Sequence, residues 1–154
     1  DETYLLLEQP YRAANRPLFS ISELRLVNGF TPEVMDVLAW HVTALPERTA
    51  INANTATPEV LHALHEELTS ADVEMLINDR GEDGYTEKAL LMENDAFAGL
   101  ELKIDLDVAS NWFSVLTDVT VGGGRARVDS VLKRGDKQMY VLSRTRGLHR
   151  LGSL

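Results

Sequence analysis

Apolar side chains recur every three or four positions through much of the first half of the chain, which is the period of an α-helix. The pattern covers residues 21–27, 34–42 and 60–68, and it predicts a short helix at each. The inner face of the second helix is expected to consist of Val34, Val37, Leu38 and Val42. The apolar stripe of the third is expected to consist of Val60, Leu61, Leu64 and Leu68. The first part of the chain is therefore predicted to be built from short amphipathic helices.

Polar residues mark where these helices begin and end. Ser20 and Glu23 fit a capping box, in which the hydroxyl accepts from the backbone at Glu23 and the carboxylate reaches back. Thr–Pro pairs at 31–32 and 57–58 place a capping hydroxyl before a proline, whose missing N–H costs nothing at the first helical position. Gly29 stands where a left-handed residue ends a helix. Two helix–turn–helix units result, joined by an asparagine-rich connector that looks buried.

Further helices are predicted beyond this pair of units. One is expected to open at 69–70, with Asp72 placed to cap it, and to run through Ile77. Residues 81–84 form a glycine-containing loop, and a shorter helix is predicted near 87–95. Helices therefore account for most of the first 95 residues.

The period changes to two beyond the helical region. Valines and a phenylalanine alternate with polar residues over 113–121, the pattern of a half-buried strand. Glycines at 122–124 make a turn, residues 125–133 alternate again, and a tight hairpin turn at 135–136 precedes a last strand over 139–145. The sequence thus predicts an antiparallel meander of at least three strands. Its apolar face needs a cover, and the helices are the obvious cover within this chain.

These patterns place the chain in the α+β class. We predict a helical domain of the SAM-like or helix-hairpin-helix-like kind over residues 1–97, antiparallel strands over 98–148 and a flexible tail over 149–154. Charge changes near the same place, because residues 1–107 hold 21 acidic against 7 basic side chains and residues 108–154 hold 3 against 8. The opposite balances indicate two structural units with different surfaces.

Composition narrows the class of protein. The 154 residues carry a net charge of −9 and no cysteine, which excludes disulfides, thiolate metal sites and cysteine nucleophiles. No apolar run approaches the roughly 18 to 20 residues that a membrane helix needs. The chain opens with Asp1 and not with methionine, so we expect a processed or truncated piece of a longer protein.

Candidate catalytic and metal-binding residues are few. His62 and His65 lie three apart and would share a helix face, but Thr69 stands where an H-E-x-x-H motif needs its second histidine. A solvated helix face is therefore favoured over a zinc site. Close acidic pairs such as Asp105 and Asp107 lack the D-x-D-x-D-G pattern of a calcium loop, and no serine lies in a G-x-S-x-G elbow. The chain is predicted not to be an enzyme.

Nucleic-acid binding is the alternative function that these helices suggest. Short helical hairpins with a glycine turn, and the phrase I-N-x-N-T-A at 51–56, are similar to helix-hairpin-helix DNA modules. Those modules present glycine-rich hairpins with nearby Lys or Arg to phosphates, whereas here Gly29 is followed by Pro32, Glu33 and Asp36. The acidic balance also opposes phosphate contact. We therefore expect no nucleic-acid partner and keep this module as the alternative.

The order of motifs along the chain resembles one known family. The matching stretches are PYRAANRPLFSISELRLVNGFTPEV (10–34), VTALP (42–46), INANTATPEVLHAL (51–64), SNWFSV (110–115) and VLSR (141–144). They are similar to type II secretion system protein K, a minor pseudopilin. The most telling part is RAAN (12–15) followed by ISELRL (21–26).

The resemblance implies a fold and a place of action. Family members have a membrane-anchoring amino-terminal helix, a pilin-like sheet and a large helical domain inserted into it. This chain would lack the anchor helix and the first part of the pilin domain. Family members act at the tip of the periplasmic pseudopilus, on the periplasmic face of the bacterial inner membrane, with the I and J minor pseudopilins as partners. The expected function is non-enzymatic assembly for protein export, with surfaces presented to those partners and to secreted cargo.

Two further expectations follow from this resemblance. Family members bind calcium in the helical domain, and Asp1 and Glu2 would be the end of that ligand set. Since the chain would lack the spine helix of a pilin, its strands should expose an apolar face, for example at Val115, Val119 or Val128.

Overall fold

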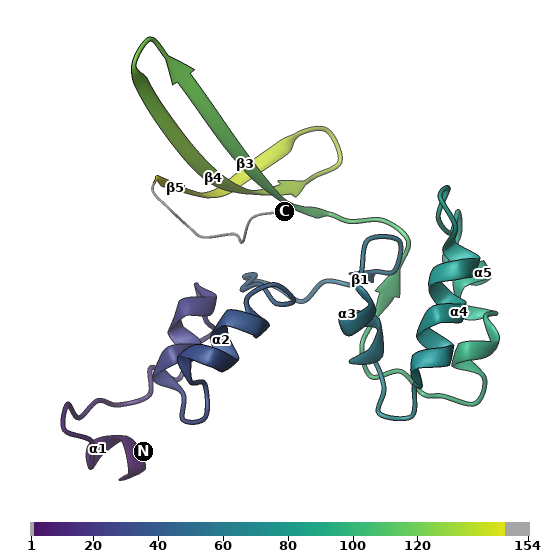
Figure 1. The fold of residues 1–154 in the computed structure, drawn as a ribbon, viewed down its shortest axis with the longest axis horizontal. Helices are drawn as coiled ribbons and strands as arrows, with labels where there is room; N and C mark the ends of the chain where they lie inside the picture. The colour runs from purple at the N-terminus through teal and green to yellow at the C-terminus, as the bar shows by residue number, and fades with distance from the viewer. Residues whose placement is uncertain (1, 147–154) are drawn as a thin grey trace. The chain divides into compact units, whose positions relative to one another are not determined.

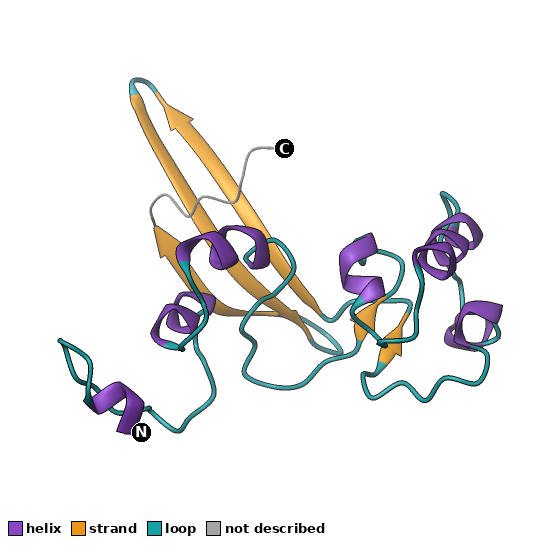
Figure 2. Ribbon diagram, turned by 60° about the horizontal axis from the view of Figure 1, so that its bottom comes forward, coloured by secondary structure: helices purple, strands orange, loops and turns teal. Residues whose placement is uncertain are grey.

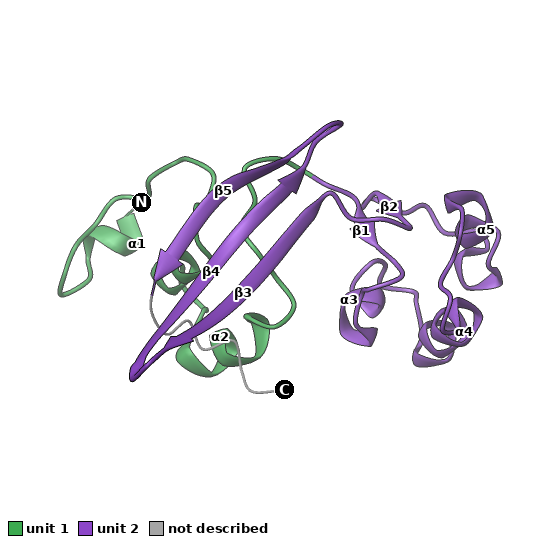
Figure 3. Ribbon diagram, turned by 90° about the horizontal axis from the view of Figure 1, so that it is seen from above, with its two compact units in different colours: residues 1–48 green, residues 49–154 purple. Residues whose placement is uncertain are grey.

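The computed structural model of the protein describes residues 2–146 (Figure 1). The chain divides into two compact units, residues 1–48 and residues 49–154, which Figure 3 colours separately. Helices and antiparallel strands are both present, which confirms the α+β class. The predicted domain boundary near residue 97 lies inside the second unit and stays a prediction. The tail predicted over 149–154 lies outside the described residues.

Short helical segments with well-formed caps make up unit 1. They are α1 (Glu2–Leu5), the 3-10 helix η1 (Ile21–Leu26) and α2 (Pro32–Leu38). The predicted capping box is confirmed, with the Glu23 carboxylate accepting from the Ser20 N–H at 3.1 Å. Thr31 caps α2 and Pro32 takes its first position, as predicted. Gly29 has a φ of 93°, the left-handed conformation expected of it.

The predicted inner face of α2 is wrong. Met35 is the buried residue of this helix, whereas Val34, Val37 and Val42 are exposed, Val37 by 66%, and Leu38 is half-buried. The reason is that α2 has 7 residues and packs against η1, so the side that carries Met35 is the one that faces a neighbour. Unit 1 therefore leaves most of its apolar side chains exposed.

Unit 2 begins with a helical part, defined here as residues 49–107. Its elements are β1 (Ile51–Asn52), α3 (Pro58–His62), α4 (Ser70–Arg80), α5 (Lys88–Met92), η2 (Asp95–Phe97) and β2 (Leu106–Asp107). Thr57 caps α3, and Thr69 caps α4 in a capping box with Asp72, so these predicted helix starts are confirmed. In place of one helix over 87–95, the chain forms α5 and then the 3-10 turn η2.

A cluster of buried apolar side chains holds the helical part together. Its members are Ala53, Leu61, Leu64, Leu68, Val73, Leu76, Leu91, Ala96, Phe97 and Leu106. The predicted stripe is confirmed for Leu61, Leu64 and Leu68, while Val60 is half-buried. Fully burying a leucine contributes about 1.5–3 kcal/mol. The cluster is therefore the main source of stability in this part of the chain.

Two short strands far apart in sequence close the helical part. β1 and β2 pair in parallel, with Ile51 opposite Leu106. The Ile51 N–H donates to the Asp105 carbonyl and the Ala53 N–H to the Asp107 carbonyl, both at 2.9 Å. No local pattern predicted this pairing, which joins the asparagine-rich connector to the segment that leads into the sheet.

A three-stranded antiparallel sheet forms the rest of unit 2 (Figure 2). Its strands, in spatial order, are β3 (Trp112–Val121), β4 (Gly124–Arg134) and β5 (Met139–Arg146). The predicted meander is therefore confirmed, with turns at 122–123 and 135–138. β5 pairs only with Val128–Arg134 of β4, so the outer part of the β3–β4 hairpin is a two-stranded ribbon within the described residues.

The helices of unit 2 do not cover this sheet. No described residue of β3, β4 or β5 belongs to the buried cluster, and Ser130 is the one buried residue in these strands. The interpretation that these helices cover the apolar face is therefore wrong, because their apolar side chains pack into a cluster of their own. In the part of the chain that the structure describes, we also find no helix with the length and apolar character needed to cross a bilayer.

Candidate functional site

The two faces of the sheet differ in chemistry. Side chains alternate along each strand, so the register between the strands gathers most apolar residues on one face, called here the open face. Its apolar members are Phe113, Val115, Val119, Val121, Ala126, Val128, Leu132, Met139 and Val141. Val115 is 39% exposed and Val119 46%, which confirms the expected exposed face at these residues, while Val128 is half-buried. An exposed apolar face of this kind marks an interaction surface.

Ion pairs and hydrogen bonds occupy the opposite face. Arg127 makes a bidentate pair with the Asp118 carboxylate at 2.9 and 2.7 Å, and Arg125 lies 3.6 Å from the same carboxylate. The hydrogen bond from Arg127 holds the pKa of Asp118 below its ordinary value. Ser114 donates to Asp129 at 3.2 Å. Leu116 and Tyr140 are also exposed on this face, but most apolar side chains of the strands lie on the open face, which is therefore the stronger candidate for contact with a further protein segment.

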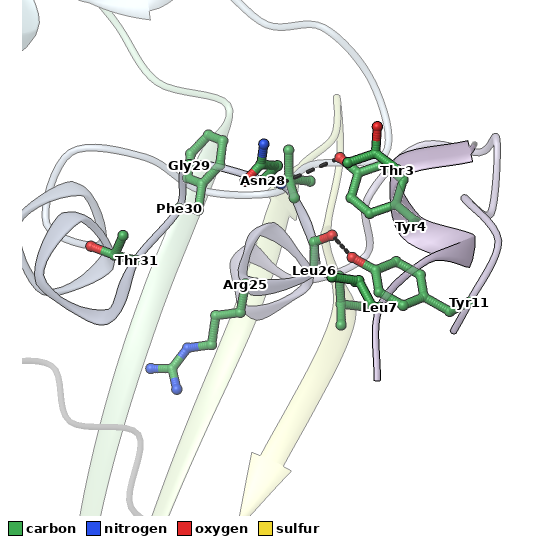
Figure 4. Close-up of a pocket in the computed structure, with 11 residues that line it drawn as sticks. Thr3, Tyr4, Leu7, Tyr11, Arg25, Leu26, Asn28, Gly29, Phe30 and Thr31 are labelled. Carbon is green, nitrogen blue, oxygen red and sulfur yellow. Dashed lines mark hydrogen bonds between the residues drawn. The ribbon is translucent and has the colours of Figure 1, made fainter. Parts of the chain in front are cut away.

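Unit 1 contains a pocket of about 250 Å³ beside α1 (Figure 4). It is lined by Thr3, Tyr4, Leu7, Tyr11, Arg25, Leu26, Val27, Asn28, Gly29, Phe30 and Thr31. The Tyr11 hydroxyl donates to the Leu26 carbonyl, and the Asn28 N–H donates to the Tyr4 hydroxyl at 3.3 Å. Burial, and then the neighbouring Tyr4, raise the pKa of Tyr11. The two hydroxyls thus bind the backbone at the end of η1 and just after it.

The asparagine-rich connector is a hydrogen-bonding centre of the helical part. Asn54 donates from Nδ2 to the carbonyls of Tyr85 and Val108, both at 2.9 Å, and its Oδ1 accepts from the Tyr85 N–H at 2.7 Å. Asn52 donates from Nδ2 to the Ser110 hydroxyl at 2.9 Å. Both asparagines are half-buried, and an amide that is shielded from water needs such partners because an unpaired polar group is costly. The connector is therefore structural.

A second polar network lies between α4 and α5. Asn94 donates to the Asp79 carboxylate at 2.5 Å and to the Tyr85 hydroxyl at 3.3 Å, and that hydroxyl donates to the Leu76 carbonyl at 3.0 Å. Burial, and then the charge of Asp79, raise the pKa of Tyr85. No buried side-chain nitrogen or oxygen in residues 2–146 lacks a hydrogen-bond partner. The hydrogen-bonding groups of this network are therefore paired with one another.

The described residues do not form a calcium site by themselves. Asp1 lies outside the described residues, and Glu2 opens α1 with an exposed side chain. Among residues 2–146, no group of three or more His, Asp or Glu side chains is placed to hold a metal ion. Calcium takes six to eight oxygen ligands, so Glu2 alone does not fit it.

The histidines singled out from the sequence also stay apart. α3 ends at His62, so His62 and His65 do not share a helix face, and that part of the prediction is wrong. His65 instead accepts from the Glu67 N–H through Nδ1 at 3.2 Å. Asp105 pairs with Lys88 at 2.6 Å, which lowers the pKa of Asp105. The zinc alternative therefore has no geometry to support it here.

Sequence reasoning missed two sets of residues. The tyrosine pair of unit 1 is Tyr4, in α1, and Tyr11, whose rings are tilted by 35° with centroids 5.1 Å apart. No motif signals this contact. The roles of Asn52 and Asn54 were also missed, although a signal existed. Two amides in an otherwise apolar stretch need partners when that stretch is buried.

Known proteins match the chain in two consecutive pieces. Two family models, each described as type II secretion system (T2SS), protein K, match residues 1–47 and residues 51–115. The gap between the matches falls where unit 1 gives way to unit 2. The second match runs from β1 into β3, so it includes the junction between the helical part and the sheet.

Individual relatives agree with these models. Type II secretion system protein K of Pseudomonas aeruginosa is 33% identical over 149 residues, which cover 96% of this chain and 44% of the relative. The protein of the same description from Aeromonas hydrophila is 33% identical over 158 residues, covering 96% and 47%. A chain in the crystal structure of the GspK-GspI-GspJ complex from the enterotoxigenic Escherichia coli Type 2 Secretion System matches with a TM-score of 0.78 and 30% identity, over 96% of this chain and 55% of that one. The chain thus spans about half the length of the relatives it matches.

Proposed function

The chain belongs to the type II secretion system protein K family, and we propose that it is part of a minor pseudopilin, a non-enzymatic subunit that assembles for protein export. It would act by presenting shaped surfaces to other proteins. One observation carries the proposal. Nearly the whole chain, 96% of it, shares its fold with a chain in a complex of three proteins of this secretion system, with a TM-score of 0.78.

In this proposal the helical segments belong to an insertion in a pilin-like protein, and β3, β4 and β5 are strands of its pilin sheet. The open face would then receive the amino-terminal helix of the full-length protein. Two features support this assignment. The open face is apolar and exposed. The opposite face, in contrast, carries the ion pair between Asp118 and Arg127. A sheet with one apolar face gains stability when a helix covers that face.

We place the full-length protein at the pseudopilus tip, on the periplasmic face of the inner membrane, beside I- and J-type minor pseudopilins. The matched structure is a complex of such proteins, which supports the choice of partners. The helical segments within residues 1–107 make the subunit larger than a sheet alone would be. A subunit enlarged in this way has room at the end of a filament, where no further subunit stacks on it. Secreted cargo is a further partner that the exposed apolar residues of unit 1 would suit.

Co-purification tests the proposal. The complete periplasmic region of this protein is expressed together with those of the I- and J-type pseudopilins from the same organism. Affinity purification through a tag on this protein should recover both partners. Val119→Asp, on the open face, should disturb the packing of the amino-terminal helix on the sheet and thereby reduce recovery sharply. Thr120→Asp is the matched control, because it places the same charge one residue away on the opposite face. Failure of the unaltered protein to recover either partner would sink the proposal.

Calcium binding by the helical domain of the full-length protein is a second part of the proposal, with Asp1 and Glu2 at the end of the ligand set. The acidic balance of residues 1–107, with 21 acidic against 7 basic side chains, supports it. Calcium at 100 times its Kd would stabilise the folded state by about 2.7 kcal/mol, so a chelator should lower the melting temperature. Glu2→Gln should weaken this shift. A melting temperature that the chelator does not change would contradict calcium binding.

A further inference from the structure

The segment that joins the helical part to the sheet is held by side chains of the connector. Residues 108–111 lie between β2 and β3. The Val108 carbonyl accepts from Asn54 Nδ2, and the Ser110 hydroxyl accepts from Asn52 Nδ2, each at 2.9 Å. Two of these residues are therefore fastened to the helical part after its last strand has ended.

The next residue is already part of the sheet. The Asn111 carbonyl accepts from the Arg134 N–H at 2.7 Å, which extends the β3–β4 ladder by one rung. Its neighbour Ser110 is the last residue fastened to the helical part. Of the four junction residues, Val108 and Ser110 are therefore bonded to the helical part and Asn111 is bonded to the sheet.

The two asparagines are themselves firmly held. Asn52 Oδ1 accepts from the Asn54 N–H at 3.0 Å, and Asn54 bonds both the N–H and the carbonyl of Tyr85, at 2.7 and 2.9 Å. Ala53 between them belongs to the buried cluster. Neither amide can follow a moving partner without breaking these bonds, so the positions of Val108 and Ser110 are tied to the core of the helical part.

From this geometry we propose that Asn52 and Asn54 are positioning residues that make the junction a stiff joint. The helical part and the sheet then move as one body and present their surfaces to other proteins in one orientation. Without the two amides, residues 108–111 would be a short linker, and hinges form at a few element-terminal residues of this kind. The proposal concerns the mechanics of the chain and stands apart from the assembly role proposed above.

Backbone ¹⁵N relaxation of the 154-residue chain tests the joint. In the unaltered protein, amides of residues 51–107 and of 112–146 should report one common tumbling time. Asn52→Ala removes the bond to Ser110, so the sheet amides should lose the common value and report a shorter time, while chemical shifts within each part persist. Asn111→Ala is the control, since that side chain is exposed and has no hydrogen bond in the described structure. It should keep the common value.

Ser110→Ala removes the same hydrogen bond from the junction side and leaves the helical part intact. Ser110→Ala should also give the helical part and the sheet separate tumbling times. It therefore tests the proposal even if Asn52→Ala unfolds the helical part. A common tumbling time retained in folded Ser110→Ala would overturn the proposal, as would separate tumbling in the unaltered protein. Neither result depends on partner pseudopilins, so failure of co-purification leaves this test unaffected.

Discussion

In the helical part of unit 2 a cluster of apolar side chains is buried, and Leu76, Leu91 and Leu106 are fully buried. In the sheet of the same unit, apolar side chains on the open face stay exposed, Val121 by 76% and Val141 by 49%. Both parts have regular backbone hydrogen bonding. The difference therefore lies in what covers the apolar side chains.

This contrast separates two sources of stability. The helical part carries its own hydrophobic cluster, whereas the sheet depends on its ladder and on pairs across its strands, such as Arg134 over the Phe113 ring at 4.8 Å. Cross-strand pairs contribute about 0.2–1 kcal/mol each, less than the roughly 1.5–3 kcal/mol from burying one leucine. The sheet is thus the part of unit 2 that has the most to gain from a partner segment.

Unit 1 is like the sheet in this respect. Met35 is the one buried residue among its described residues, and Leu6 and Phe19 are largely exposed. Its helices η1 and α2 begin with well-formed caps, yet Met35 is the one side chain that they bury. Good local structure therefore does not by itself produce a core.

The largest expected effect comes from emptying the core of the helical part. Leu91→Ala removes a side chain with 0% exposure and should lower the free energy of unfolding by about 2–5 kcal/mol, measured by urea denaturation. Leu90→Ala is the matched control, because Leu90 is the exposed neighbour on α5 and its loss should cost about 0.5 kcal/mol or less. An equal decrease in the free energy of unfolding for the two variants would contradict the distinction between buried and exposed apolar residues.

Removing the Asn54 amide should have the next largest effect. Asn54→Ala leaves the Tyr85 N–H and the Val108 carbonyl without their partner, so the free energy of unfolding should fall by about 1–3 kcal/mol. Hydrogen exchange at the Tyr85 amide should accelerate accordingly. Asn111→Ala, at an exposed position, should leave both measurements unchanged. An unaltered exchange rate at Tyr85 would show that this bond contributes nothing.

The open face should tolerate polar substitution. Val115→Thr with Val119→Thr keeps the β-branched shape that strands favour, so the free energy of unfolding should change by no more than about 0.5 kcal/mol for each substitution. Binding of the fluorescent dye ANS should fall, because the dye reports exposed apolar surface. The reverse change on the same face, Thr117→Val, should raise it. A loss of several kcal/mol in the double variant would mean that the face is packed and not open.

The smallest effect is expected from the ion pair on the opposite face. The hydrogen bond from Arg127 lowers the pKa of Asp118, so the ionised carboxylate stabilises the sheet above the ordinary carboxyl pKa of about 4. That contribution is lost as the pH falls through the lowered pKa. Asp118→Asn should make sheet unfolding less sensitive to acid below pH about 4, followed by Trp112 fluorescence in a Trp40→Phe background. Asp136→Asn, in the turn, should leave the acid profile as it is.

Part of the candidate site could be predicted before any coordinates. Period-two alternation placed strands at β3, β4 and β5, and the family resemblance added that these strands would expose an apolar face. Exposed Val115 and Val119 confirm that expectation. The calcium ligands stay a prediction, since Asp1 lies outside the described residues and Glu2 belongs to no group of three or more acidic or histidine side chains there. The joint at Asn52 and Asn54 was not predicted, because its partners lie 31 to 58 positions away.

The sequence by itself determined where elements start and stop. The Thr69–Asp72 capping box, the left-handed Gly29 and the hairpin turns rest on contacts within about four residues, which a linear pattern contains. Only the tertiary structure decided that Met35 is the buried residue of α2, that β1 pairs with β2, and that the helices of unit 2 leave the open face uncovered. These outcomes depend on which surfaces meet, and many distant segments with suitable patterns compete for each surface.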